Sequence, residues 1–135
     1  MFRVKYTFFL LVLSFFLGGC EEEFPVYTTV LQNHTLSLPC LHYTVLDIND
    51  KKRVENAFGS KDDLQCVYRV ELTKYKIDAC NNPVVKSVGG DFNGYVRIEV
   101  KKGFTSVFKV QSDYKNDMNA AFQRVLRKIS SVTGV

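Results

Sequence analysis

The sequence has few of the residues on which most catalytic and metal sites depend. Its 135 residues include no tryptophan and two histidines, His34 and His42, and neither histidine stands in a metal-ligand spacing. No Cys-x-x-Cys occurs, and the glycine-rich stretch 89–94 matches neither a phosphate-binding loop nor a dinucleotide fingerprint. We therefore expect a protein that is not an enzyme, with no metal and no cofactor.

Strong charge is also missing. The formal net charge is +4, and it falls to +2 if Arg3 and Lys5 are removed with the N-terminal segment described below. A charge this small gives no electrostatic reason to expect a nucleic-acid partner.

The chain contains no apolar run long enough to be a transmembrane helix. The longest, Tyr6 to Leu17, holds 12 residues, whereas a helix needs about 20 to span a bilayer. Arg3 and Lys5 precede this run, and two small residues, Gly18 and Gly19, follow it. This order of charge, apolar run and small residues is typical of a secretory signal peptide over residues 1–19.

The stretch Leu17-Gly18-Gly19-Cys20 resembles the lipobox of bacterial lipoproteins, which signal peptidase II cleaves. The resemblance implies cleavage before Cys20, a diacylglycerol thioether on its sulfur and acylation of its new amino group. Stable anchoring in a membrane requires more than one acyl chain. In the enterobacterial sorting rule an Asp after this Cys retains the protein at the inner membrane. Glu21 stands there instead, so we expect an outer-membrane location in the cell envelope.

The remaining chain divides into a tether and one domain. We expect residues 20–30 to form the lipidated Cys and an acidic tether, with a possible strand at Val26 to Leu31, and residues 31–135 to form a single globular domain. Thr35 to Val45, interrupted by Pro39, and Val84 to Val88 are further candidate strands.

Alternation of apolar and polar residues predicts a β-meander. Strands are expected over Cys66 to Ile77, Phe92 to Lys101 and Phe104 to Gln111, with Gly94 as a bulge or kink. We expect Phe104, Phe108 and Val110 to face the core. The pattern also places Glu71 and Glu99 on neighbouring strands, where each alternates with an arginine, as in a cross-strand charge ladder.

Two helices are predicted from their apolar spacing. A short one runs from about Asp50, its cap, to Phe58, and Gly59 ends it. A longer amphipathic helix runs from Asp113 to about Ser130. Its apolar residues form one stripe, which we expect to pack on the sheet: Met118, Ala121, Phe122, Val125, Leu126 and Ile129.

Besides Cys20, three cysteines remain: Cys40, Cys66 and Cys80. A strand over 66–77 would hold its ends about 36 Å apart, so a Cys66–Cys80 disulfide is disfavoured. We favour a Cys40–Cys80 disulfide with Cys66 buried as a small hydrophobe. The alternative is Cys40–Cys66, with Cys80 as an exposed thiol.

These elements predict an α+β fold, an antiparallel meander with one short helix and a C-terminal amphipathic helix packed on it. The alternative is an immunoglobulin-like β-sandwich with a C-terminal helix. In element order the domain is similar to small envelope lipoproteins, including uncharacterised ones. The resemblance implies a non-catalytic binding or scaffolding subunit with an envelope protein partner. The alternative function is a surface-exposed, adhesin-like lipoprotein.

Overall fold

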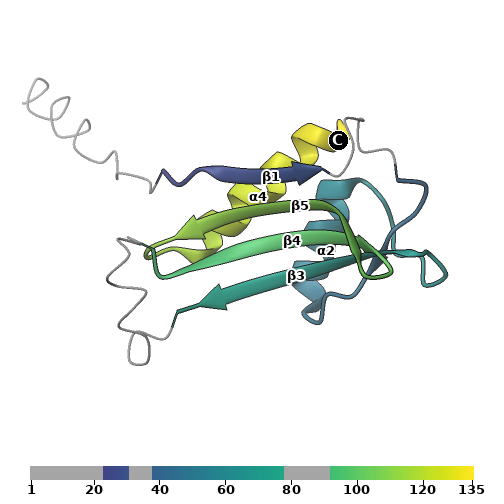
Figure 1. The fold of residues 1–135 in the computed structure, drawn as a ribbon, viewed down its shortest axis with the longest axis horizontal. Helices are drawn as coiled ribbons and strands as arrows, with labels where there is room; N and C mark the ends of the chain where they lie inside the picture. Colours follow the sequence, from purple (N-terminus) through teal and green to yellow (C-terminus); the bar gives the residue numbers. More distant parts are fainter. Residues whose placement is uncertain (1–22, 31–37, 78–91) are drawn as a thin grey trace, which may run out of the picture.

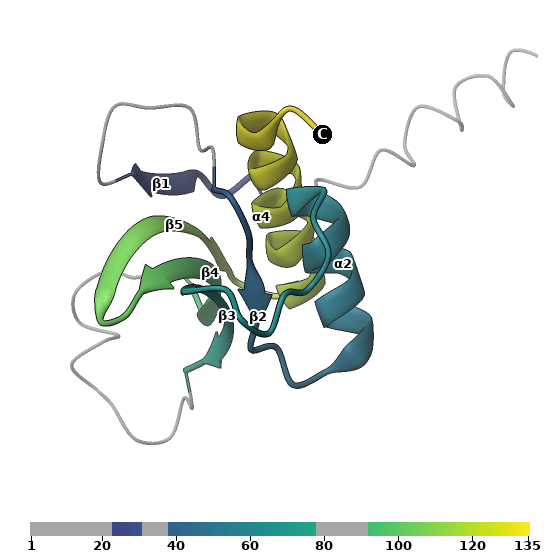
Figure 2. The same cartoon turned by 90° about the vertical axis from the view of Figure 1, so that its right-hand side faces the viewer.

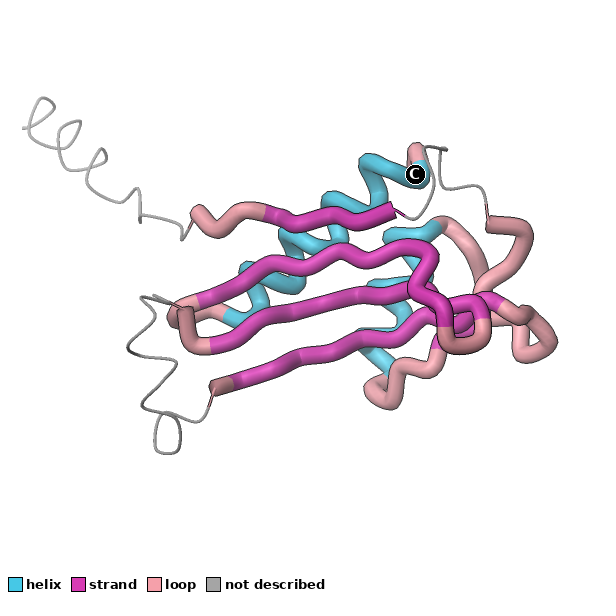
Figure 3. The backbone as a smooth tube through the Cα atoms, in the orientation of Figure 1, coloured by secondary structure: helices cyan, strands magenta, loops and turns pink. Residues whose placement is uncertain are grey.

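The computed structural model describes residues 23–30, 38–77 and 92–135. One sheet of five strands carries two helices (Figures 1 and 3), and its strand order is β1-β5-β4-β3-β2. In chain order the elements are β1 (Val26–Val30), β2 (His42–Tyr43), α2 (Ile48–Phe58), β3 (Tyr68–Lys76), β4 (Gly94–Lys102), β5 (Thr105–Tyr114) and α4 (Met118–Thr133).

The predicted α+β class is confirmed. Four strands pair antiparallel, while the short β2 lies parallel to β3 at the sheet edge. Both helices lie on the same side of the sheet (Figure 2), with α4 across β4 and β5 and α2 beside α4. The described residues form one sheet, so the sandwich alternative is wrong for this part of the chain.

Alternating side chains of the meander form the core, as predicted. Val96, Ile98 and Val100 of β4 are fully buried, and so are Phe108 and Val110 of the neighbouring β5. These residues contact the apolar stripe of α4, which is buried as expected at Ala121, Phe122, Val125, Leu126 and Ile129. Neither described helix lies on the other face of the sheet.

Phe104 does not join this core, and that prediction is wrong. Its side chain is fully exposed, because the residue lies in the turn between β4 and β5, before β5 begins. Gly103 takes a left-handed conformation there, with φ +60°, and the pairing of the two strands shifts register between Val100 and Lys101. The alternation read from the sequence therefore does not extend into the turn.

Gly94 is neither a bulge nor a kink but a point of close approach. It pairs regularly with Lys76 and Tyr114 at the start of β4. A Cβ atom at this position would collide with the Tyr75 carbonyl oxygen and lie 2.5 Å from the Tyr114 hydroxyl, which donates a hydrogen bond to that carbonyl. Only glycine fits at this position, because any other residue would bring a Cβ atom into this contact.

α2 begins earlier than predicted and α4 begins later, because other aspartates cap them. Asp47 accepts hydrogen bonds from the amides of Asn49 and Asp50, so α2 begins at Ile48. Asp117 caps α4 through the Ala120 amide, while Asp113 lies in β5. The end of α2 is confirmed: Gly59 is left-handed, with φ 68°.

The strand predicted at Val26 to Leu31 is present as β1 and belongs to the sheet. The domain therefore includes residues of the predicted 20–30 tether. Of the strand predicted over Thr35 to Val45, the two residues of β2 form in the described part. Val84 to Val88 lies outside the described residues. Neither of the two described helices has the length and apolar character needed to cross a membrane.

Packing of α4 on the sheet predicts a large effect of truncating Phe122, which is fully buried. We expect Phe122→Ala to lower the free energy of unfolding by about 3–5 kcal/mol. Gln123→Ala, at the exposed neighbouring position, should change it by no more than about 0.5 kcal/mol. Chemical denaturation of both variants tests this, and equal stabilities would contradict the packing.

Candidate functional site

A disulfide joins Cys40 to Cys66, with Cα atoms 5.7 Å apart. The favoured Cys40–Cys80 pairing is therefore wrong, and the alternative pairing is the one found. The parallel pairing of β2 with β3 explains this bridge. His42 lies opposite Arg69, so the two segments run side by side and place Cys40 next to Cys66. Cys80 and Cys20 lie outside the described residues.

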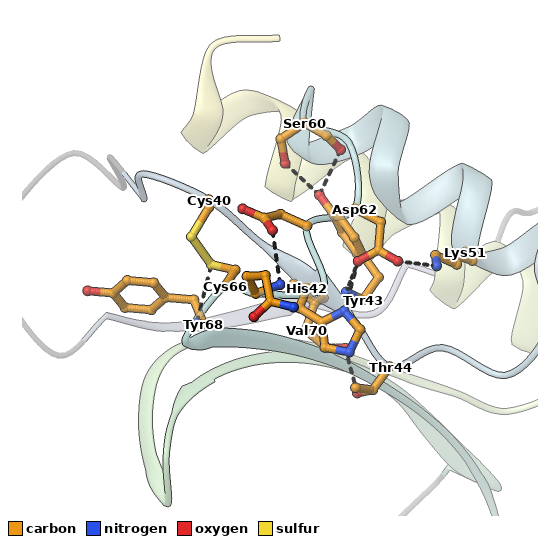
Figure 4. A network of polar contacts seen from close by, with 12 residues as sticks. Cys40, His42, Tyr43, Thr44, Lys51, Ser60, Asp62, Cys66, Tyr68 and Val70 are labelled. Atoms are coloured by element: carbon orange, nitrogen blue, oxygen red, sulfur yellow. Dashed lines mark hydrogen bonds and ion pairs between the residues drawn. A yellow bond between two sulfur atoms is a disulfide. The ribbon is translucent and has the colours of Figure 1, made fainter.

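Next to the disulfide, Asp62 accepts three hydrogen bonds (Figure 4). The donors are His42 Nδ1 at 2.9 Å, the Tyr43 amide at 3.0 Å and Lys51 Nζ at 2.5 Å. They come from β2 and from α2, so a single carboxylate ties the loop before β3 to both elements. We call Asp62, His42, Tyr43 and Lys51 the Asp62 clamp.

The environment of Asp62 favours its charged form. Burial is the largest single influence and would raise the pKa of Asp62. The hydrogen bonds from Lys51, the Tyr43 amide and His42, together with the charge of Lys51, outweigh burial and lower the pKa to about 2. The carboxylate is therefore ionised at neutral pH and is a weak base.

A histidine beside an aspartate is a pairing that also occurs in catalytic sites, where the histidine contacts a nucleophile. Here the nearby Ser60 hydroxyl is hydrogen-bonded to the Tyr43 hydroxyl at 2.7 Å, and the Tyr43 hydroxyl donates to the Ser60 carbonyl. Burial, the main influence, raises the pKa of Tyr43. These contacts give the Asp62 clamp a structural role. His42 is a strand residue, as expected, and His34 lies outside the described residues.

The helix-free face of the sheet is polar and carries the predicted charge ladder. Glu71 and Glu99 lie directly opposite each other on β3 and β4, as the alternation indicated. The cation that joins them is Lys101, with Nζ 2.6 Å from Glu71 and 3.8 Å from Glu99. The hydrogen bond to Glu71 is the main reason why the pKa of Lys101 is raised. Arg97 instead contacts Tyr95 and Gln111.

Beside the ladder lies a group that the sequence analysis did not identify. Tyr75 and Tyr95 stack across β3 and β4 with ring centroids 5.1 Å apart. The Arg97 guanidinium lies 4.8 Å from the centre of the Tyr95 ring, and its Nε donates to Gln111 at 2.9 Å. We call this surface the tyrosine–arginine patch; its members are Tyr27, Tyr75, Tyr95, Arg97, Gln111 and Asp113.

The remaining members extend the patch over two more strands. Gln111 Nε2 donates to Asp113 at 3.0 Å on β5, and Tyr27 of β1 lies opposite Gln111. Tyr27 and Tyr75 are 55% and 47% exposed, which is high for large aromatic side chains. The patch therefore presents two exposed rings, of which Tyr75 is stacked on Tyr95, beside hydrogen-bonding groups. Alternation alone places Tyr95 and Arg97 on this face, but only the strand register brings in the other members.

On the opposite side of the molecule, α2 and α4 border an open groove of about 540 Å³. Its lining combines Ala57 and Leu126 with two arginines, Arg53 and Arg127. Arg53 is already engaged, since it lies 4.2 Å from the centre of the Phe122 ring and donates to Asn119. The tyrosine–arginine patch is the stronger candidate for binding, because the rings of Tyr27 and Tyr75 are exposed.

Within the described ranges, no group of three or more His, Cys, Asp or Glu side chains is placed to hold a metal ion. Comparison with known proteins finds no family model, no curated protein and no solved structure that matches the chain.

The Asp62 clamp makes a prediction about stability and pH. Asp62→Asn should lower the free energy of unfolding by about 1–3 kcal/mol at neutral pH, because charged hydrogen bonds are lost. The contribution of Asp62 is complete above its unfolded-state pKa of about 4 and is lost as pH falls through the folded value of about 2. The difference from wild type should therefore shrink between these pH values.

Denaturation of Asp62→Asn from pH 7 to pH 2 measures this, with the exposed neighbour variant Asp63→Asn as the control. A deficit of Asp62→Asn that stays constant down to pH 2 would show that the carboxylate charge is not the cause.

The disulfide makes a second prediction. A peptide map of the unreduced protein should link Cys40 to Cys66, and a Cys40–Cys80 peptide would contradict the structure. The bridge closes a sequence separation of 26 residues, for which loop-closure entropy gives roughly 3–4 kcal/mol of stability. Cys40→Ala and Cys66→Ala should each lose a similar amount, since either removes the same bond.

Proposed function

We propose that this protein is a lipid-anchored, non-catalytic lipoprotein of the bacterial cell envelope, where it serves as a binding subunit of a protein complex. The membrane attachment is the acylated Cys20, at the outer membrane. The observation that carries the binding role is the tyrosine–arginine patch on the helix-free face of the sheet.

The position of β1 supports a domain held close to the membrane. Val26 comes six residues after Cys20, and an extended chain spans at most about 3.5 Å per residue, so the anchor allows a separation of roughly 20 Å. The start of β1 therefore lies within this distance of the bilayer. The turn between β4 and β5 is at the opposite end of the sheet (Figure 1).

The patch lies near the end of the sheet at which β1 starts. Tyr27 is the second residue of β1, Tyr95 is the second residue of β4, and Tyr75 is one residue from the end of β3. A protein bound there is itself close to the membrane surface, as a membrane-associated partner would be.

The chemistry of the patch suits a protein partner. Tyrosine and arginine dominate the residues that contribute most binding energy in protein interfaces. Tyrosine offers a large contact area at a low cost in conformational entropy, and the stacking of Tyr75 on Tyr95 reduces that cost further. Arg97 is held between the Tyr95 ring and Gln111, so it too is ordered before binding.

The test is affinity purification of the tagged full-length protein from detergent-extracted membranes, with mass spectrometry. We expect wild type to retain specific envelope proteins and Arg97→Ala to lose them, because truncating a central interface arginine costs about 2 kcal/mol or more. The matched control is Arg69→Ala, an exposed arginine on the same face of β3. Equal recovery of envelope proteins with both variants would contradict a binding role for the patch.

Cys20→Ala tests the anchor in the same experiment, since it should move the protein from the membrane to the soluble fraction. Protease treatment of intact cells separates this function from surface display: we expect digestion only after the outer membrane is permeabilised.

A further inference from the structure

Among the described residues, the outer edge of β1 is an open pairing surface. β1 pairs with β5 along one side, from Val26 opposite Ser112 to Val30 opposite Phe108. On its other side, no backbone hydrogen bond joins β1 to another described segment. Alternate residues of an edge strand direct their N–H and C=O groups outward, so this edge is able to accept another strand.

β1 lacks the features that usually prevent such pairing. Natural edges are protected by charged side chains, especially lysine, by proline within the strand or by bulges. The sequence of β1 is Val-Tyr-Thr-Thr-Val, without charge or proline, and its pairing with β5 is regular. Four of its five residues are exposed.

The opposite edge of the same sheet is protected. β2 pairs with β3 only at Arg69 and Val70, and no other described segment pairs with β3 on that side. The rest of the strand carries Lys76, which is exposed, and Lys74, which pairs with Asp50 at 2.6 Å and lies over the Phe122 ring. The two edges therefore differ: β3 carries lysines, which disfavour the pairing of two edges, whereas β1 carries no charge.

We propose that β1 pairs antiparallel with β1 of a second copy of the chain, with a two-fold axis at Thr28. In this register Thr28 lies opposite its own copy, Val26 opposite Val30, and Tyr27 opposite Thr29. Val26 and Val30 form an apolar, β-branched pair, and no like charges meet. The interface uses the same surface from both chains, as a two-fold dimer requires.

The register favours a second copy, because the strand is complementary to itself: Val26 meets Val30, and the strand has no charged side chain. Pairing would join the two sheets into one, and Tyr27 of each copy would lie beside the two-fold axis. The two tyrosine–arginine patches would then form one continuous surface. The pairing itself depends neither on the anchor at Cys20 nor on the function proposed for the patch.

The test measures the mass of the purified full-length protein in detergent by analytical ultracentrifugation. We expect wild type to be a dimer in reversible equilibrium and Thr28→Lys to dissociate several-fold more readily, because it places two lysines opposite each other. The matched control is Thr73→Lys, at an exposed threonine on β3, which should dimerise as wild type does.

A charge exchange separates lost pairing from lost folding. Mixing Thr28→Lys with Thr28→Asp should restore a dimer that contains one chain of each, since opposite charges then meet. A monomeric wild type, a dimer unaffected by Thr28→Lys, or a mixture that stays monomeric would each overturn the proposal. So would equal loss of the dimer with Thr73→Lys.

Discussion

Burial of one face of a single sheet is the constraint on which this structure depends. The meander alone has an apolar face that water would destabilise, and α4 alone is a helix too short to persist without packing. Each removes the apolar surface of the other from water, with Phe122 and Phe108 fully buried between them. Because the two described helices cover that side of the sheet, the opposite face can carry polar and aromatic side chains.

A second set of interactions fixes the region that the helix–sheet core does not organise. The segment from Cys40 to Cys66 holds β2, α2 and a loop, and it has only two residues in the sheet before β3. The disulfide closes this segment at its ends, and the Asp62 clamp ties its interior together through three donors. Covalent and ionic contacts here supply the order that long strands supply elsewhere.

Periodicity was sufficient to predict the elements that bury an apolar surface. The meander strands, the stripe of α4 and the end of α2 at Gly59 all follow from the spacing of residues along the chain. The errors have a different origin. The Cys40–Cys66 bridge depends on a parallel pairing of a two-residue strand, which has no periodic signal. Phe104 continues an apolar alternation that the turn interrupts. The tyrosine–arginine patch joins residues of four strands, so it requires the register of all of them.

The place of β1 has a mechanical consequence. A pull on the residues before Val26, directed along β1 and opposed by the rest of the sheet, acts along the axis of this strand. All five pairs between β1 and β5 then resist together in shear, instead of opening one after another as they would under a perpendicular, peeling force. When the force acts along β1, this outer strand therefore resists being pulled out of the sheet, although it has a partner strand on one side only.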